Sequence, residues 1–333
     1  MFKDTPLYNI SSDKVLNKEL LPPFIRNNCT KAKFNKWLER RASYVERDQK
    51  KLLTTITQFP DSTSLDINIW IMMITRALSV EDCYWINDSN MSLGWNDVNP
   101  INNSLANALV PYLLDNPDDA KDITFETVEY TTGGSVEKAW HRENSEFYMY
   151  KSTRYKYEVM VSQILDAMNV EHVKYSESNL YGIPMCKCIN IANEYFSRIP
   201  ASEVRDTFSS QIEFNKYMYE NFPTEFITMN VIDYLIGNID RHGKNWGFLM
   251  HNSTGRIIKP HPLFDHNWTF GEVTIRHGAN SKVFQGYKLR DVALSMCDKI
   301  RLNVQKDKMP EFMNKNQEVY FYNACKECGV EIV

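Results

Sequence analysis

The chain has 333 residues, of which 43% are hydrophobic and 13% aromatic, enough to bury a substantial core in one or two packed units. The formal net charge of -4 and the isoelectric point near 6.0 give no general attraction to nucleic acid or to an anionic membrane. No apolar run approaches the length of a membrane span, and the first twelve residues lack the apolar core of a signal peptide. We therefore expect a soluble, cytoplasmic protein with no direct nucleic-acid or membrane binding.

The N-terminal third is predicted to be mainly helical. Thr30 can cap a helix that carries Phe34, Trp37 and Leu38 at helical spacing. A buried helix is expected over residues 66–78, and a loop-rich connection over residues 87–103. Acidic residues interrupt the basic ones in the first helix, so its charges indicate a solvated helix face rather than a nucleic-acid patch.

The pattern changes at residue 123 to short β-type runs at residues 123–130, 136–140 and 147–151. Gly133-Gly134-Ser135 lies between the first two runs. A glycine pair lets the backbone approach a ligand and turn amide N–H groups inward, as a phosphate-covering loop requires. The same pair is also a common hairpin turn, and the residues leave both interpretations open.

Lys151 ends the third run, and a helix over residues 157–168 follows with Glu158 in its first turn. A strand lysine followed by a helix glutamate is the arrangement with which kinases clamp nucleotide phosphates. The alternative is an ordinary surface lysine and a glutamate favoured by the helix dipole.

The most informative segment runs from residue 240 to residue 265. A helix capped by Thr224 is expected to end at Gly237. The loop Asp240-Arg241-His242-Gly243-Lys244-Asn245 follows. Strands at residues 246–251 and 256–259 then form a hairpin that returns Asp265 to the neighbourhood of Asp240.

This order of polar residues suits phosphoryl transfer. Asp240 can orient the acceptor hydroxyl and accept its proton, and the oxygen atoms of Asn245 and Asp265 can hold Mg²⁺ against the phosphates. The alternative is a local salt bridge between Asp240 and Arg241, with Asn245 in a turn and Asp265 as a cap.

The cysteines do not indicate a metal site. Cys186 and Cys188 alternate on an expected strand, and Cys325 and Cys328 form a C-x-x-C pair. Zinc would need these two distant pairs to meet in space. Seven irregularly spaced cysteines suit reduced thiols, and we predict no metal–thiolate site.

At these residues the chain resembles a known family. Asp240-Arg241-His242-x-x-Asn245 and the later Pro262-Leu263-Phe264-Asp265 look like the active-site signature of HipA-like serine/threonine kinases, which are related in fold to phosphatidylinositol kinases. Gly134-Ser135-x-x-Lys138-x-Trp140-x-Arg142 is similar to the nucleotide loop of that family, and residues 148–151 to its lysine strand. Residues 37–41, 78–86 and 95–99 resemble a HipA-like branch common in Gram-positive bacteria and phages. The likeness covers residues 34–270.

The resemblance implies an α+β, two-lobed protein-kinase-like fold. A helical N-terminal extension would occupy residues 1–122, a small β-rich N-lobe residues 123–195, and a mainly helical C-lobe residues 196–333. ATP and Mg²⁺ would lie in the cleft, with Asp240 as catalytic base, His242 as its support, and Asn245 and Asp265 as metal ligands. The strand at residues 185–190 would be the hinge that faces adenine. The expected nucleotide-binding residues are Gly133, Gly134, Ser135, Lys138, Lys151, Glu158, Cys188 and Ile189.

Three functions are compatible with the sequence. The favoured one is a serine/threonine protein kinase that autophosphorylates, with Ser135 as the preferred acceptor. A small-molecule or lipid kinase would use the same cleft, although no basic amphipathic stretch favours a lipid. A catalytically silent binding module is the third, and the intact Asp240, Asn245 and Asp265 count against it. The chain also departs from HipA by its short glycine loop and by lacking the module that pairs with an antitoxin, so an antitoxin or regulatory partner is not identified.

Overall fold

The computed structural model describes residues 1–43, 69, 72–73, 76–87, 92–100, 138–144, 146–180 and 182–333. The expected strand at residues 123–130 and the glycine loop at residues 133–135 lie outside these ranges, as does most of the helix expected over residues 66–78. The described part mixes helices and antiparallel sheets. None of its helices is both long enough and apolar enough to cross a bilayer.

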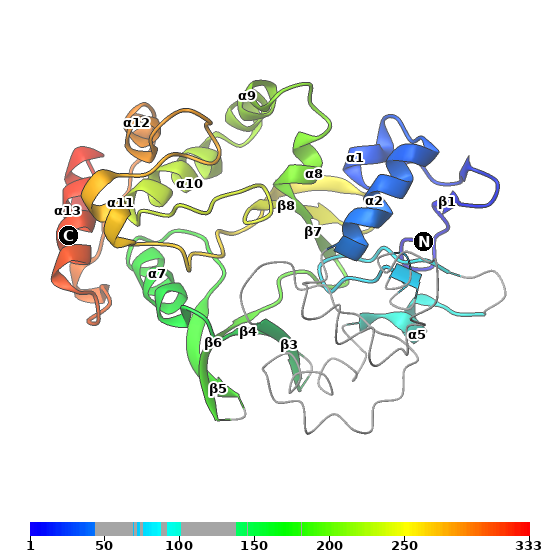
Figure 1. The fold of residues 1–333 in the computed structure, drawn as a ribbon, viewed down its shortest axis with the longest axis horizontal. Coiled ribbons are helices and arrows are strands. Elements are labelled where there is room, and N and C mark those ends of the chain that lie inside the picture. The colour runs from blue at the N-terminus through cyan, green and yellow to red at the C-terminus, as the bar shows by residue number, and fades with distance from the viewer. Residues whose placement is uncertain are drawn as a thin grey trace, which may run out of the picture.

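The N-terminal elements lie at one end of the long axis of the molecule, opposite the C-terminal helix (Figure 1). The expected helix after Thr30 is confirmed, and the hydroxyl of Thr30 accepts a hydrogen bond from the backbone N–H of Lys33 at 3.3 Å. The helix expected to reach residue 78 does not do so, because Arg76 and Ala77 both have positive φ angles near 50°. The elements here are β1 (Tyr8–Asn9), β2 (Lys14–Val15), α1 (Pro23–Arg26), α2 (Lys31–Ser43) and α5 (Trp95–Val98), the last within the expected loop.

A four-stranded antiparallel sheet follows in the order β3-β4-β6-β5. Its strands are β3 (Lys138–Glu143), β4 (Glu146–Lys151), β5 (Tyr175–Leu180) and β6 (Ile183–Ile189). Helix α7 (Tyr155–Ala167) packs on β5 and β6 and buries Val159, Ile164 and Leu165. The strands expected over residues 147–151 and 185–190 and the helix expected over residues 157–168 are therefore present as β4, β6 and α7, and β3 overlaps the strand expected over residues 136–140.

A second sheet has the order β7-β8-β9, with β7 (Phe196–Pro200), β8 (Gly247–His251) and β9 (Arg256–Pro260). The predicted hairpin is confirmed as β8 and β9, and Gly255 in its turn has a φ of 65°. Gly247 has no room for a side chain, because a Cβ atom there would lie 2.2 Å from the carbonyl oxygen of Ile199 on β7. This close contact brings the start of β8, directly after the loop at residues 240–245, against β7.

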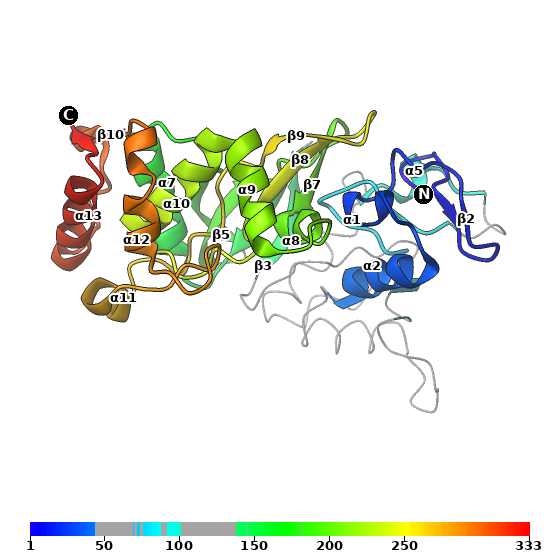
Figure 2. The same cartoon turned by 90° about the horizontal axis from the view of Figure 1, so that it is seen from above.

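The remaining helices extend along the long axis, from α8 beside the second sheet to α13 at the C-terminal end (Figure 2). Helix α10 contacts α9, α12 and α13 and lies in the core. The prediction that Thr224 caps α10 is wrong: Phe222 is the N-cap and Pro223 the first helical residue, a position that suits a residue without an N–H. The elements are α8 (Ala201–Arg205), α9 (Gln211–Asn221), α10 (Pro223–Leu235), α11 (Glu272–His277), α12 (Leu289–Leu294), α13 (Lys315–Glu327), the short η3 (Cys297–Lys299) and η4 (Lys306–Lys308), and the parallel pair β10 (Asn303–Val304) and β11 (Glu331–Ile332).

Candidate active site

Lys151, at the end of β4, lies between two carboxylates. Its Nζ atom is 2.7 Å from Oε1 of Glu158 on α7 and 2.9 Å from Oδ1 of Asp265, which follows the β8–β9 hairpin. The side chains of Lys151 and Glu158 are almost completely buried, whereas that of Asp265 is 22% exposed. Burial alone would lower the pKa of Lys151, but Asp265 and Glu158 raise it well above its usual value. The ammonium group of Lys151 therefore stays protonated although it is almost completely shielded from water.

The loop after α10 holds Asp240 and Asn245 against each other. The side-chain amide of Asn245 donates to the backbone carbonyl of Asp240 at 2.9 Å and to its carboxylate at 3.2 Å. His242 lies beside them, with Nε2 3.8 Å from Oδ2 of Asp240. The carboxylate of Asp240 is one-third exposed and Asn245 is buried. A carboxylate with this orientation and exposure can reach a hydroxyl group brought by a substrate.

Arg241 holds the loop at residues 240–245 in place. Its guanidinium forms a buried ion pair with Asp233 of α10 at 2.9 Å. Through Nη1 it also donates to the backbone carbonyls of Asn245 at 2.6 Å and Phe264 at 2.7 Å. One side chain thus connects α10, the loop and the residue before Asp265. The alternative in which Arg241 pairs with Asp240 is not what the structure shows.

The backbone turn at Asp265 has an unusual conformation and is held by Glu158. Asp265 has a φ of 59°, in the left-handed region that a non-glycine residue seldom adopts. The next backbone N–H, that of His266, donates to Oε2 of Glu158 at 2.8 Å. Glu158 therefore contacts Lys151 with one oxygen and the Asp265–His266 turn with the other. Burial, followed by the nearby Arg241, lowers the pKa of His266 well below its usual value, so this imidazole is neutral.

A small cavity of about 100 Å³ lies beside these groups. The loop contributes His242, Lys244 and Asn245 to its lining, and Lys151 and Asp265 complete that side. Asn245 uses its amide nitrogen on Asp240, and no described residue donates to its Oδ1 atom. Mg²⁺ takes one or two protein oxygens and completes its shell with water and phosphate oxygens. The oxygens of Asn245 and Asp265 fit that requirement.

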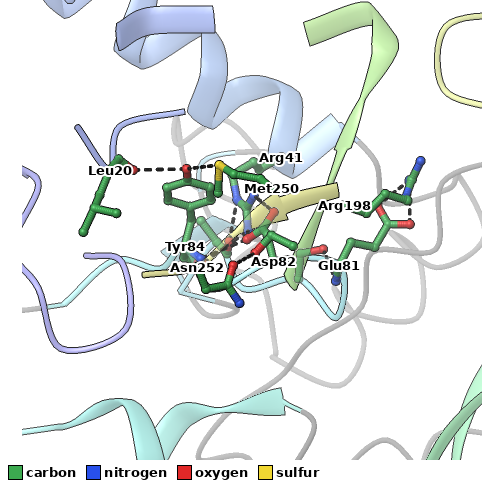
Figure 3. Close-up of polar contacts among 11 residues, drawn as sticks. Leu20, Arg41, Glu81, Asp82, Tyr84, Arg198, Met250 and Asn252 are labelled. Carbon is green, nitrogen blue, oxygen red and sulfur yellow. Dashed lines mark hydrogen bonds and ion pairs between the residues drawn. The ribbon is translucent and has the colours of Figure 1, made fainter. Parts of the chain in front are cut away.

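Part of the lining of the cavity comes from the N-terminal part of the chain. Residues 78, 79, 81 and 82 line it, and we call residues 78–82 the wall segment. Asp82 forms a bidentate ion pair with Arg41 of α2 at 2.7 and 3.0 Å. Glu81 pairs with Arg198 of β7 at 2.6 Å, as Figure 3 shows. The backbone carbonyl of Glu81 also accepts from the N–H of Arg198 at 2.7 Å. Arginine side chains therefore hold both acidic residues of the wall segment, Glu81 and Asp82, in place.

The structure does not bring all of the expected residues to this cavity. Cys188 lies inside the four-stranded sheet, opposite Met149 and Tyr175, and burial raises the pKa of its thiol to about 12. Ile189 is 40% exposed at the end of β6. Lys138, on β3, is paired in register with Lys151 on β4. Gly133, Gly134 and Ser135 lie outside the described residues.

Two groups of residues were missed by reasoning from the sequence. Asp233 is one, although its position eight residues before Arg241, on the last turns of an apolar helix, could have suggested a buried ion pair. The wall segment and its partners are the other. Glu81 and Arg198 are 117 residues apart, and no local pattern connects them.

No protein-family model matches the chain, and no curated protein matches it. Among solved structures, it is similar to the proinflammatory kinase CtkA of Helicobacter pylori, with a TM-score of 0.45 and 15% identity over 59% of this chain and 88% of that one. It is also similar to HipA of Shewanella oneidensis, solved as a toxin–antitoxin complex with HipB and operator DNA, with a TM-score of 0.44 and 10% identity over 87% of this chain and 84% of that one. A HipA protein is thus among its structural neighbours. Both TM-scores lie below 0.5, so the case for function depends on the side-chain geometry.

Proposed function

We propose that this protein is an ATP- and Mg²⁺-dependent serine/threonine protein kinase of HipA-like type. The observation that carries the proposal is the contact of Lys151 with both Glu158 and Asp265. Each of the three comes from a different element, and an ordinary surface lysine would not be buried between two carboxylates. A lysine–glutamate pair beside a metal-binding aspartate is what phosphoryl transfer from ATP requires.

In this proposal each polar group has one task. Lys151 contacts the phosphates of ATP, and Glu158 holds it in place. Asn245 and Asp265 would hold Mg²⁺, which would supply positive charge to offset the negative charge on the phosphates. Asp240 orients the acceptor hydroxyl and takes its proton as that oxygen bonds to the γ-phosphorus and ADP leaves. His242 supports the loop.

The wider predictions belong to the same proposal. The four-stranded sheet with α7 would be the N-lobe and the helices from α8 onward the C-lobe. Residues 133–135 would cover the phosphates together with Lys138, and the end of β6 at Cys188 and Ile189 would face adenine. Autophosphorylation at Ser135 would add nearly two negative charges against the triphosphate and push the loop out of the cleft. The acceptor would otherwise be a serine or threonine of a protein, and regulation by an antitoxin-like partner remains part of the hypothesis.

The substitution Asp240→Asn tests the proposal. The amide keeps the shape of the side chain but cannot take the proton, so we expect phosphoryl transfer to fall by a factor of about 10² or more without a change in melting temperature. Autophosphorylation with radiolabelled ATP and thermal unfolding should be measured on the same preparations. Asp206→Asn, which alters an aspartate outside the cavity, is the matched control and should keep full activity. Full activity in a folded Asp240→Asn protein would remove Asp240 from the mechanism.

A further inference from the structure

Glu203 is a buried carboxylate that the mechanism above does not use. It lies in the first turn of α8, is only 7% exposed, and borders the same cavity as Asn245 and Asp265. No hydrogen bond joins its carboxylate to any residue that the structure describes. Its neighbour Pro200, at the N-cap of α8, borders the cavity as well.

The arginines around Glu203 are committed to other acids. Arg41 is paired with Asp82 and Arg198 with Glu81, and no ion pair joins either of them to Glu203 among the described contacts. Arg40, on the same side, is 2.6 Å from Asp206. The three arginines therefore act on Glu203 only through longer-range electrostatic attraction, and no residue in the described part of the chain donates a hydrogen bond to its carboxylate.

A carboxylate that receives no hydrogen bond from the chain is stabilised by water, by an ion or by a donor group that a ligand supplies. Here the outside partner would have to enter the cavity. The cavity volume of about 100 Å³ corresponds to roughly three water molecules. A hydroxyl or amino group attached to a larger molecule fits this space.

We propose that Glu203 is a substrate-contacting residue, whose carboxylate accepts a hydrogen bond from a hydroxyl or N–H group that a substrate brings into the cavity. The inference rests on the proposed kinase function, because it assigns the cavity to a substrate of that reaction. Two substrates carry such donors. One is the ribose of the nucleotide, and the other is the acceptor, whose backbone or side chain would enter beside Asn245. The wall segment at residues 78–82 lines the cavity in either case.

The first experiment measures nucleotide binding by calorimetry in the wild type, Glu203→Leu and Glu203→Gln. The ligands are Mg²⁺ with ADP, 2′-deoxy-ADP and 3′-deoxy-ADP. If the donor is the ribose, Glu203→Leu should weaken ADP binding about 10-fold or more, and one deoxy analogue should bind equally weakly to the wild type and to the variant. Glu203→Gln keeps an acceptor oxygen and should stay within about 3-fold of the wild type.

The second experiment measures transfer to dephosphorylated casein, a generic serine/threonine acceptor, together with autophosphorylation. If the donor belongs to the acceptor, ADP binding should be unchanged in Glu203→Leu, while KM for casein rises about 10-fold and Glu203→Gln restores it. Glu220→Leu, on the exposed face of α9, is the control for loss of a glutamate and should behave as the wild type.

The outcomes separate this inference from the kinase proposal. Wild-type values for nucleotide affinity, KM and autophosphorylation in a folded Glu203→Leu protein would overturn the role of Glu203 and leave the kinase intact. Equal losses in Glu203→Leu and Glu203→Gln would also overturn it, because a hydrogen-bond acceptor would then not be what matters. Failure of the wild type itself to bind ADP or transfer phosphate would refute the kinase proposal.

Discussion

Two networks of arginine ion pairs surround the candidate site, and they differ in how deeply their side chains are buried. In the loop network, Arg241 and Asp233 have side chains that are 1% and 2% exposed. In the wall network, shown in Figure 3, the pair of Arg41 and Asp82 is 7% and 10% exposed, and the pair of Arg198 and Glu81 is 13% and 31% exposed. The first lies within one short stretch of chain, and the second joins parts of the chain that are far apart in sequence.

The difference in depth predicts different consequences of mutation. A fully buried ion pair cannot exchange a lost partner for water, so removal of one partner leaves an uncompensated charge in the core. A pair at the rim of a cavity can be rehydrated, and its loss has a smaller effect. The loop network should therefore contribute more to stability than the wall network, which also holds residues 78–82 against the cavity.

The largest expected effect is that of Asp233→Asn. The substitution keeps the shape of the side chain but leaves the guanidinium of Arg241 without a counter-charge, so we expect a loss of about 3–5 kcal/mol in the free energy of unfolding. Urea denaturation at pH 7 measures it. Asp206→Asn breaks the more exposed pair with Arg40 and should lose less than about 1 kcal/mol. Similar losses in the two variants would contradict the expectation that the loss depends on how deeply an ion pair is buried.

Glu203 gives a prediction about pH. Burial raises the pKa of Glu203 from 4.5 to about 7, although the nearby Arg41 opposes the shift. A raised carboxyl pKa means that the folded protein binds this proton more tightly than the unfolded chain. The stabilisation is therefore complete below pH 4.5 and is lost as the pH rises to about 7.

Glu203→Gln removes this loss, since glutamine does not titrate. Compared with the wild type, the variant should gain stability progressively between pH 4.5 and about pH 7, by at most about 3 kcal/mol. Thermal unfolding of both proteins across this pH range measures the difference. A constant difference at all pH values would show that Glu203 keeps an ordinary pKa, and that its carboxylate is better solvated than its burial indicates.

The smallest effects are expected in the wall network itself. Asp82→Asn should lose about 1–3 kcal/mol, because Arg41 is buried and loses a bidentate ionic partner. Glu81→Gln should lose less than about 1 kcal/mol, since the side chain is partly exposed and the backbone hydrogen bond to Arg198 stays. Chemical denaturation of the two variants side by side gives the comparison. A larger loss in Glu81→Gln than in Asp82→Asn would reverse the order of the two pairs.

Local sequence determined much of the site. The spacing of Asp240 and Asn245 puts both on one tight loop, and the hairpin turn at Gly255 brings Asp265 back along the chain. Lys151 and Glu158 are seven residues apart, on a strand and the helix that follows it. Contacts of this kind depend on turn geometry and periodicity, which short stretches of sequence encode.

Only the tertiary structure decided the rest. The burial of Arg241 against Asp233, the closure of the cavity by residues 78–82 and the isolation of Glu203 all depend on which elements pack together. A charged residue looks the same in a sequence whether it is solvated or buried. The partner of a charged residue, its pKa and its contribution to stability depend on distances and exposures that packing imposes. Glu81 and Arg198 pair across 117 residues, so no short sequence pattern predicts their contact.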